Sequence, residues 1–137
     1  MAAGLYVLDA RAPVQSQGAP LPHLVSMALC SAPPSPEGNF RDELCEATGY
    51  RRQLVEFGPM DRRKATLTRS RTLRNRGRVV FGPFEGAIPE RLFAVMLDDN
   101  GAPVACGRLK PLRSRAGGEV IQFDASNIRM MSDRFRG

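Results

Sequence analysis

The chain has 137 residues, of which 42% are hydrophobic and 25% charged, so it has enough apolar material for one domain with a buried core. No run approaches the roughly 18 consecutive apolar residues of a membrane-spanning helix, and residues 1–8 lack the basic start and long apolar core of a secretory signal. The net charge of +6 predicts an acidic partner.

The first 22 residues are typical of an arm followed by a tether. Ala12–Pro22 is too rich in proline and small polar residues for regular structure, and ahead of it lies a β-prone tetrad, Leu5, Tyr6, Val7 and Leu8. Such an arm adds a strand either to its own sheet or to the exposed edge of another molecule. We assign this tetrad to partner binding and divide the chain into an arm, residues 1–22, and one β domain, residues 23–137.

Short β-prone runs between turn residues fill the rest of the chain. The best helical candidate, Phe40–Thr48, is short and ends before Gly49. The predicted strands are Leu24–Cys30, Tyr50–Phe57, Ala65–Leu73, Arg78–Phe81, Arg91–Leu97, Val104–Leu109, Glu119–Phe123 and Asn127–Met131. Because one sheet alone would leave an apolar face in water, they predict an all-β fold, an antiparallel two-sheet β-sandwich with an extended N-terminal arm.

The segment Arg91–Leu109 predicts a hairpin. Both alternate sets of side chains in Leu92–Leu97 are apolar, so this strand is expected to be buried on both faces, in mid-sandwich or against a neighbouring subunit. The oxygen-rich residues Asp98–Gly101 suit an ion or a turn, but the residues after them lack the ligands of a calcium loop. Asn100 and Gly101 are instead assigned to a structural turn of type I′.

Catalytic signals are weak throughout the chain. His23 is the only histidine, and Gly82–Gly86 lacks the Lys and Ser/Thr of a phosphate-binding loop. The carboxylates cluster once, on the polar side of a loop or short helix, at Glu37, Asp42, Glu43 and Glu46. No pair of cysteines has metal-ligand spacing, so we expect reduced, buried thiols at Cys30, Cys45 and Cys106. We therefore predict no enzyme activity and no catalytic, cofactor-binding or metal-binding residues.

Half of the basic residues lie in one stretch, Arg51–Arg78, which contains only two acidic residues. Three explanations stay open: an edge hairpin whose charges block unwanted strand pairing, a surface for an acidic protein, and a nucleic-acid site. Nucleic acid is the least favoured, because no aromatic residues are interleaved for base stacking. We assign partner binding to Arg62, Arg63, Lys64, Arg69, Arg71, Arg74 and Arg76.

Several segments, in this order, resemble a known family. They are Val25–Pro36, Thr48–Phe57, Asn75–Pro83, Phe93–Leu109 and Gly118–Phe123. The chain resembles, over residues 24–128, small virion proteins of tailed bacteriophages, commonly labelled tail or tail-fibre proteins, whose β-sandwich fold also occurs among capsid decoration proteins. It departs from them in its arm, where the family has a short apolar helical segment, and in its more basic central stretch.

The resemblance implies a non-enzymatic structural role with no catalytic residues and no cofactor. We expect a capsid decoration (cement) protein on the assembled shell, with a tail-tip or tail-fibre-associated protein as the alternative and a basic nucleic-acid-binding module as the second alternative. The expected partners are the major capsid protein or tail proteins and further copies of this chain, as in a trimer. Assembly would take place in the bacterial host cytoplasm, and the protein would reside in the virion, without contacting a membrane.

Overall fold

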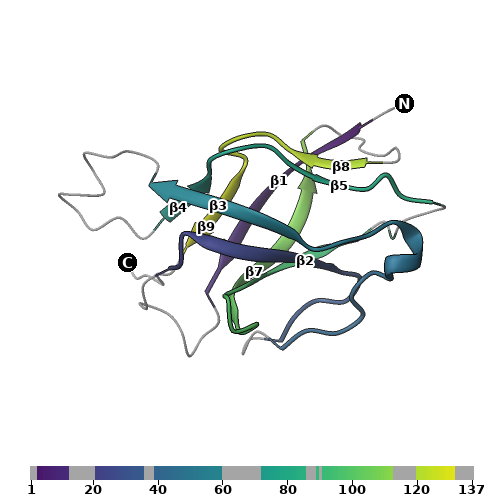
Figure 1. The fold of residues 1–137 in the computed structure, drawn as a ribbon, viewed down its shortest axis with the longest axis horizontal. Helices are drawn as coiled ribbons and strands as arrows, with labels where there is room; N and C mark the ends of the chain where they lie inside the picture. The colour runs from purple at the N-terminus through teal and green to yellow at the C-terminus, as the bar shows by residue number, and fades with distance from the viewer. Residues whose placement is uncertain are drawn as a thin grey trace.

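The strands of this protein close into a barrel (Figure 1). The computed structural model describes residues 3–12, 21–35, 39–59, 72–85, 89, 91–112 and 120–131. The strands in these residues are β1 (Ala3–Arg11), β2 (Leu24–Cys30), β3 (Gln53–Pro59), β4 (Thr72–Asn75), β5 (Val79–Phe81), β6 (Phe93–Leu97), β7 (Pro103–Pro111), β8 (Val120–Phe123) and β9 (Ile128–Met131). Seven of them form the ring β1-β7-β6-β2-β3-β4-β9, which the pairing of β9 with β1 completes. β5 and β8 pair with each other, and β8 pairs with the start of β1.

The predicted all-β class is confirmed, but the two-sheet sandwich is wrong. The ring is closed, and β1 runs antiparallel to β7 but parallel to β8 and β9, so the pairing is not wholly antiparallel either. A sandwich and a barrel both bury one face of every strand, so both produce the same alternation of apolar and polar residues. The two folds differ in whether the edge strands pair with each other. Here β1 pairs with β9 and so joins two edges that a sandwich would leave open.

The N-terminal tetrad lies inside this barrel wall rather than on a free arm. β1 is paired on both sides, with β7 on one and with β8 and then β9 on the other. Because side chains alternate across a strand, Tyr6 and Leu8 point inward and Leu5 and Val7 point outward. Leu8 is buried, and the Tyr6 ring lies 6.2 Å from that of Phe123.

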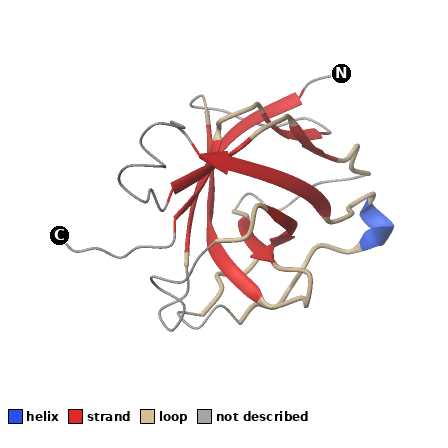
Figure 2. Cartoon of the chain, turned by 60° about the vertical axis from the view of Figure 1, so that its left-hand side comes forward, coloured by secondary structure: helices blue, strands red, loops and turns tan. Residues whose placement is uncertain are grey.

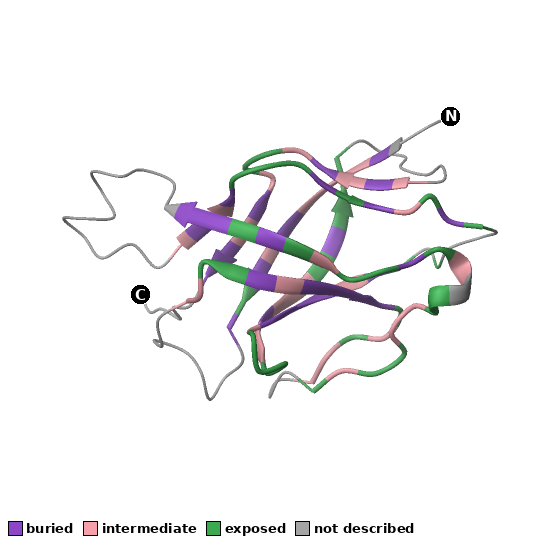
Figure 3. Ribbon diagram, in the orientation of Figure 1, coloured by how far each residue is buried: buried purple, intermediate pink, exposed green. Residues whose placement is uncertain are grey.

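Figure 2 shows the strands from a second side. Apolar side chains from the ring and from β5 and β8 fill the interior. Along β3, buried and exposed residues alternate, as expected for a strand with one face inside (Figure 3). The largest fully buried side chains include Leu8, Met27, Leu29, Phe57, Phe81, Met96, Ile121, Phe123, Ile128 and Met130. This packed interior supplies the hydrophobic stabilisation of the barrel.

A second, smaller apolar cluster covers the outside of β2 and β6. Val95 and Leu97 pack there with Ala28 and Cys30, and the half-buried Phe40 and Cys106 lie against them. The prediction that this central strand is buried on both faces is confirmed. Phe40, from the segment that follows β2, contributes to the cover, so this chain itself supplies part of it.

The connection between β6 and β7 differs from the predicted type I′ turn. Asp98 accepts hydrogen bonds on its Oδ1 from the backbone N–H groups of Asn100 and Ala102, both at 2.9 Å. Gly101 has a φ of 80°, but the φ of Asn100 is not positive. A type I′ turn needs positive φ at both central residues, so the longer loop held by Asp98 replaces it.

The helical candidate Phe40–Thr48 contains only a 3₁₀ turn, η2 (Glu46–Thr48). Where the structure describes the chain, no helix reaches the length and hydropathy needed to cross a membrane.

Two interrupted strands lie side by side at the closure of the barrel. Residues 76–78 separate β4 from β5, and residues 124–127 separate β8 from β9. Asn75, which is 1% exposed, joins the two interruptions: its Nδ2 donates to Gly77 O (2.7 Å) and Asp124 O (3.0 Å). Its Oδ1 accepts from the Ile128 N–H at 2.9 Å. One buried amide therefore satisfies three backbone groups that the interruptions leave without strand partners.

The pairing of β1 with β7 depends on a glycine. A Cβ at Gly107 would lie 2.2 Å from the backbone oxygen of Asp9, which no side-chain rearrangement relieves. We expect Gly107→Ala to lower the free energy of unfolding by about 3 kcal/mol, measured by urea denaturation. Gly77→Ala is the matched control, because a Cβ there meets nothing within 4 Å; equal loss in both variants would contradict the close packing of β1 on β7.

Candidate functional site

The outward side chains around β1 form a continuous surface, which we call the β1 face. It combines side chains from β1, β4, β5, β7, β8 and β9 that register and alternation place on the outside of the barrel, together with Leu112, which directly follows β7. Its members are Leu5, Val7, Asp9, Arg11, Arg74, Val80, Arg108, Lys110, Leu112, Gln122 and Arg129.

One end of the β1 face is apolar. Leu5 lies opposite Gln122, which in turn lies opposite Val80, so the three side chains cross β1, β8 and β5 in one row. On the other side of β1, the Leu112 N–H donates to the Leu5 backbone oxygen at 2.8 Å. Val80 is 37% exposed and Leu112 47% exposed. These aliphatic side chains therefore present apolar area to solvent on a rigid sheet.

The other end of the β1 face is basic. Arg129 binds Asp9 through two hydrogen bonds of 2.7 and 2.8 Å, and Arg74 donates to the Ser126 backbone oxygen at 2.5 Å. Asp9 is the one carboxylate among these members, which include five cations: Arg11, Arg74, Arg108, Lys110 and Arg129. The hydrogen bonds from Arg129 hold the pKa of the Asp9 carboxyl below its usual value, and Lys110 and Arg11 add to this lowering. The basic end therefore favours an acidic partner.

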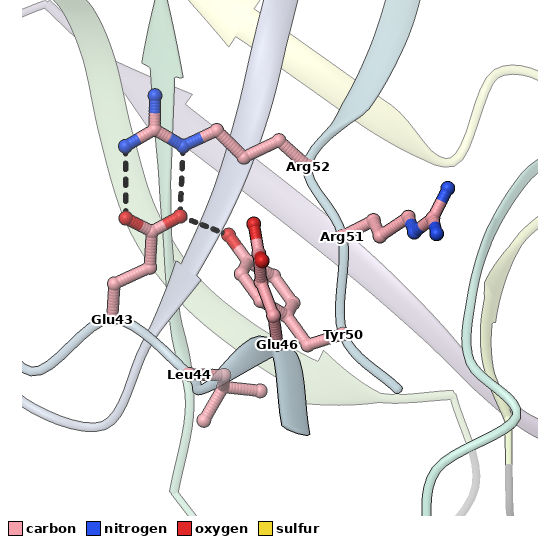
Figure 4. A pocket seen from close by; sticks show the side chains of 6 residues that line it. All are labelled: Glu43, Leu44, Glu46, Tyr50, Arg51 and Arg52. Atoms are coloured by element: carbon pink, nitrogen blue, oxygen red, sulfur yellow. Dashed lines mark hydrogen bonds and ion pairs between the residues drawn. The ribbon is translucent and has the colours of Figure 1, made fainter. Parts of the chain in front are cut away.

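A second polar arrangement lies at an open cavity of about 620 Å³ (Figure 4). Its lining residues come from the segment before β3: Glu43, Leu44, Glu46, Tyr50, Arg51 and Arg52. Arg52 binds Glu43 through two hydrogen bonds of 2.8 Å, and the Tyr50 hydroxyl donates to the same carboxylate. The hydroxyl also accepts the Leu29 N–H at 3.1 Å, so Tyr50 connects this network to the end of β2.

The network fixes the protonation of its members. Burial, followed by the hydrogen bond to Glu43, raises the pKa of Tyr50, so its hydroxyl stays protonated as a donor. The hydrogen bonds from Arg52, and then from Tyr50, lower the pKa of Glu43, so it stays ionised as an acceptor. Tyr50 also stacks on Phe81, with ring centroids 6.3 Å apart. These groups lock the segment before β3 against the barrel, which is a structural role.

Acid should weaken the fold through these two carboxylates. The pKa values of Asp9 and Glu43 are both lowered in the folded protein, so their stabilisation is present above about pH 4 and is lost as the pH falls through the folded values. We expect the free energy of unfolding to fall steeply below about pH 4. Glu43→Gln should flatten this dependence, while Asp99→Asn, at an exposed turn residue, should not; identical pH profiles for the two variants would contradict the network.

The structure separates the residues that the sequence assigned to partner binding. Leu5 and Val7 lie on the β1 face, whereas Tyr6 and Leu8 point into the barrel. Arg74 lies on the β1 face, and Arg76 lies near Glu56, with 3.9 Å between Nε and Oε2. The remaining assigned residues fall outside the described part of the chain: Arg62, Arg63, Lys64, Arg69 and Arg71.

The β1 face does not include the remaining residues that the sequence singled out: His23, the β6–β7 turn and the three cysteines. His23 donates from Nδ1 to the Phe57 backbone oxygen (3.1 Å), and Asn100 and Gly101 lie in the loop between β6 and β7. Of the three thiols, Cys30 is buried, and burial raises its pKa to about 12. Cys45 is exposed, so the expectation that all three cysteines are buried is wrong.

Sequence reasoning missed most of the basic end. Arg108 and Lys110 flank the buried Leu109, so the alternation within Val104–Leu109 and the residue after it contained a usable signal. The pair Asp9–Arg129 spans 120 residues and has no local signal.

No family model, no curated protein and no solved structure matches this chain.

Proposed function

We propose that this protein is a non-enzymatic structural component of a tailed-bacteriophage virion and that it docks through the β1 face, as a capsid decoration protein on the assembled shell. The observation that carries the docking is the β1 face itself, which joins exposed aliphatic side chains to a basic end on a closed barrel. The place in a virion rests on the resemblance of residues 24–128 to small virion proteins of tailed phages.

The composition of the β1 face supports an acidic protein as the partner. Interfaces between proteins combine an apolar area with charges at its margin, which matches Leu5, Val80 and Leu112 beside Lys110. A surface for a duplex needs cations, and one for a single strand also needs stacking side chains, whereas the apolar end offers aliphatic groups that gain nothing from phosphates. Electrostatic attraction at the basic end would speed and orient docking on an acidic shell.

Docking would use the outward side of β1 and not a free arm. The backbone of β1 is already paired with β7 and with β8 and β9, so its hydrogen-bonding groups serve the barrel. Because the backbone of β1 is already ordered, docking through Leu5 and Val7 costs no backbone ordering entropy.

A tail-tip or tail-fibre-associated position would use the same surface, and one experiment distinguishes it from the shell. Particles of the phage that encodes this chain are purified and washed, and the bound protein is located by gold-labelled antibodies in electron micrographs. Uniform labelling of heads supports decoration, and labelling confined to tails supports the alternative. Absence of the chain from washed particles would overturn the proposal.

A further inference from the structure

The two most exposed large aliphatic side chains among the described residues lie on another part of the outer wall. Leu54 on β3 is 69% exposed and Leu24 on β2 is 53% exposed. Leu24 lies opposite Glu56 and Ser26 lies opposite Leu54, so the two leucines are diagonal neighbours on the outside of the same strand pair. This patch is separate from the β1 face, since β2 and β3 contribute no residue to that face.

The charges beside Leu54 are ordered along β3. Alternation places Arg52, Leu54 and Glu56 on one face, with a cation two residues before the leucine and a carboxylate two residues after it. Each of these two charges has a partner of opposite sign within its own chain: Glu43 binds Arg52, and Arg76 lies 3.9 Å from Glu56. The patch is therefore neutral, and it has a basic and an acidic side.

This order is complementary to itself. We propose that Leu54 lies at the centre of an interface with a second copy of this chain. The two copies are related by a two-fold axis that lies in the plane of the interface, next to Leu54, and runs perpendicular to β3. Such an axis stacks the two β3 strands antiparallel, so that Arg52 of each copy faces Glu56 of the other, as a two-fold interface requires. The charges then alternate in sign across the interface: Arg76 and Glu56 of one copy are followed by Arg52 and Glu43 of the other. The interface also covers both exposed leucines, Leu24 and Leu54.

Charge selects this surface over the β1 face for contact between copies. Two β1 faces would bring five cations of each copy together with one carboxylate each, which costs free energy. The Leu54 patch lets two molecules of net charge +6 meet where each is locally neutral. The inference does not depend on the proposed function, because a dimer formed this way leaves both β1 faces free.

The test is the oligomeric state of the full-length protein, measured by sedimentation equilibrium over a range of concentrations. We expect a monomer–dimer equilibrium in which Leu54→Asp raises the dissociation constant by about 30-fold or more. Leu112→Asp, at an exposed leucine on the β1 face, should leave it unchanged, and circular dichroism should show both variants folded. A monomeric wild type at every concentration, or a Leu54→Asp variant that dimerises normally, would overturn the interface.

The geometry has its own test. Facing sheets lie about 10 Å apart, too far for a disulfide but within reach of a short bismaleimide. In a Cys45→Ser background, Leu54→Cys should cross-link to a dimer, whereas Leu112→Cys and the background alone should not. Glu56→Lys should weaken dimerisation about tenfold by facing Arg52, and Asp99→Lys, with the same change of charge, should not. Cross-linking through Leu112→Cys and not through Leu54→Cys would place the contact on the β1 face and would overturn the Leu54 interface.

Discussion

Replacing Asn75 by leucine is expected to lower the free energy of unfolding by about 4 kcal/mol, the largest loss of stability that we predict for a single substitution. The physical reason is that leucine fills the space but offers no polar atoms. The Ile128 N–H would lose its acceptor, and the backbone oxygens of Gly77 and Asp124 would lose their donor, all at a site that is 1% exposed. Urea denaturation with linear extrapolation measures the change.

Two further variants separate the hydrogen bonds from the general effect of adding an apolar side chain. Asn39→Leu, at an exposed asparagine outside the strands, should change stability by less than about 0.5 kcal/mol. Asn75→Asp keeps the acceptor for Ile128 but directs a carboxylate at two backbone oxygens, so it should be as destabilising as leucine at neutral pH. Its deficit should shrink as the pH falls, because the protonated acid can donate to one of those oxygens. If the Asn75 substitutions left the free energy of unfolding unchanged, the two strand interruptions would not depend on this side chain.

Most strands could be predicted because their signals are local. Leu24–Cys30 matches β2 at both ends, since His23 and Ser31 flank a run of β-prone residues. The closure of the barrel could not be predicted, because it depends on parallel pairing of β1 with β9, which lies more than a hundred residues away. Alternation within a strand shows which side chains are buried, but not which strand lies alongside.

The candidate site shows the same division between local and distant information. The tetrad Leu5–Leu8 was predictable as a strand, but assigning all four side chains to a partner ignored that neighbours on a strand point to opposite faces. Tyr50 could not be recognised as the centre of a network, because its partners Glu43 and Leu29 are brought to it by the fold of the segment before β3. The basic stretch indicated an acidic partner, whereas the described basic surface draws most of its cations from β1, β7 and β9.

Reversing two charges on the β1 face is expected to reduce incorporation into particles by about 100-fold. Arg11→Glu and Lys110→Glu replace two exposed cations beside Asp9 with carboxylates, so the proposed acidic shell would repel the variant in place of attracting it. The measurement is a competition: the tagged variant and the wild type are expressed together during infection, and mass spectrometry gives their ratio in purified particles. This design works even if particles cannot form without the protein, because the wild type is always present.

The matched control carries the same change of net charge at another place. Arg41→Glu and Arg91→Glu also lower the net charge from +6 to +2, but these exposed arginines lie outside the β1 face. If long-range attraction alone governs docking, both double variants should lose incorporation equally; if the β1 face contacts the partner, the loss should be confined to Arg11 and Lys110. Val80→Asp then tests the apolar end, where a buried carboxylate should cost at least about tenfold in incorporation. Full incorporation of all these variants would remove the β1 face as the docking surface while leaving the barrel and its closure untouched.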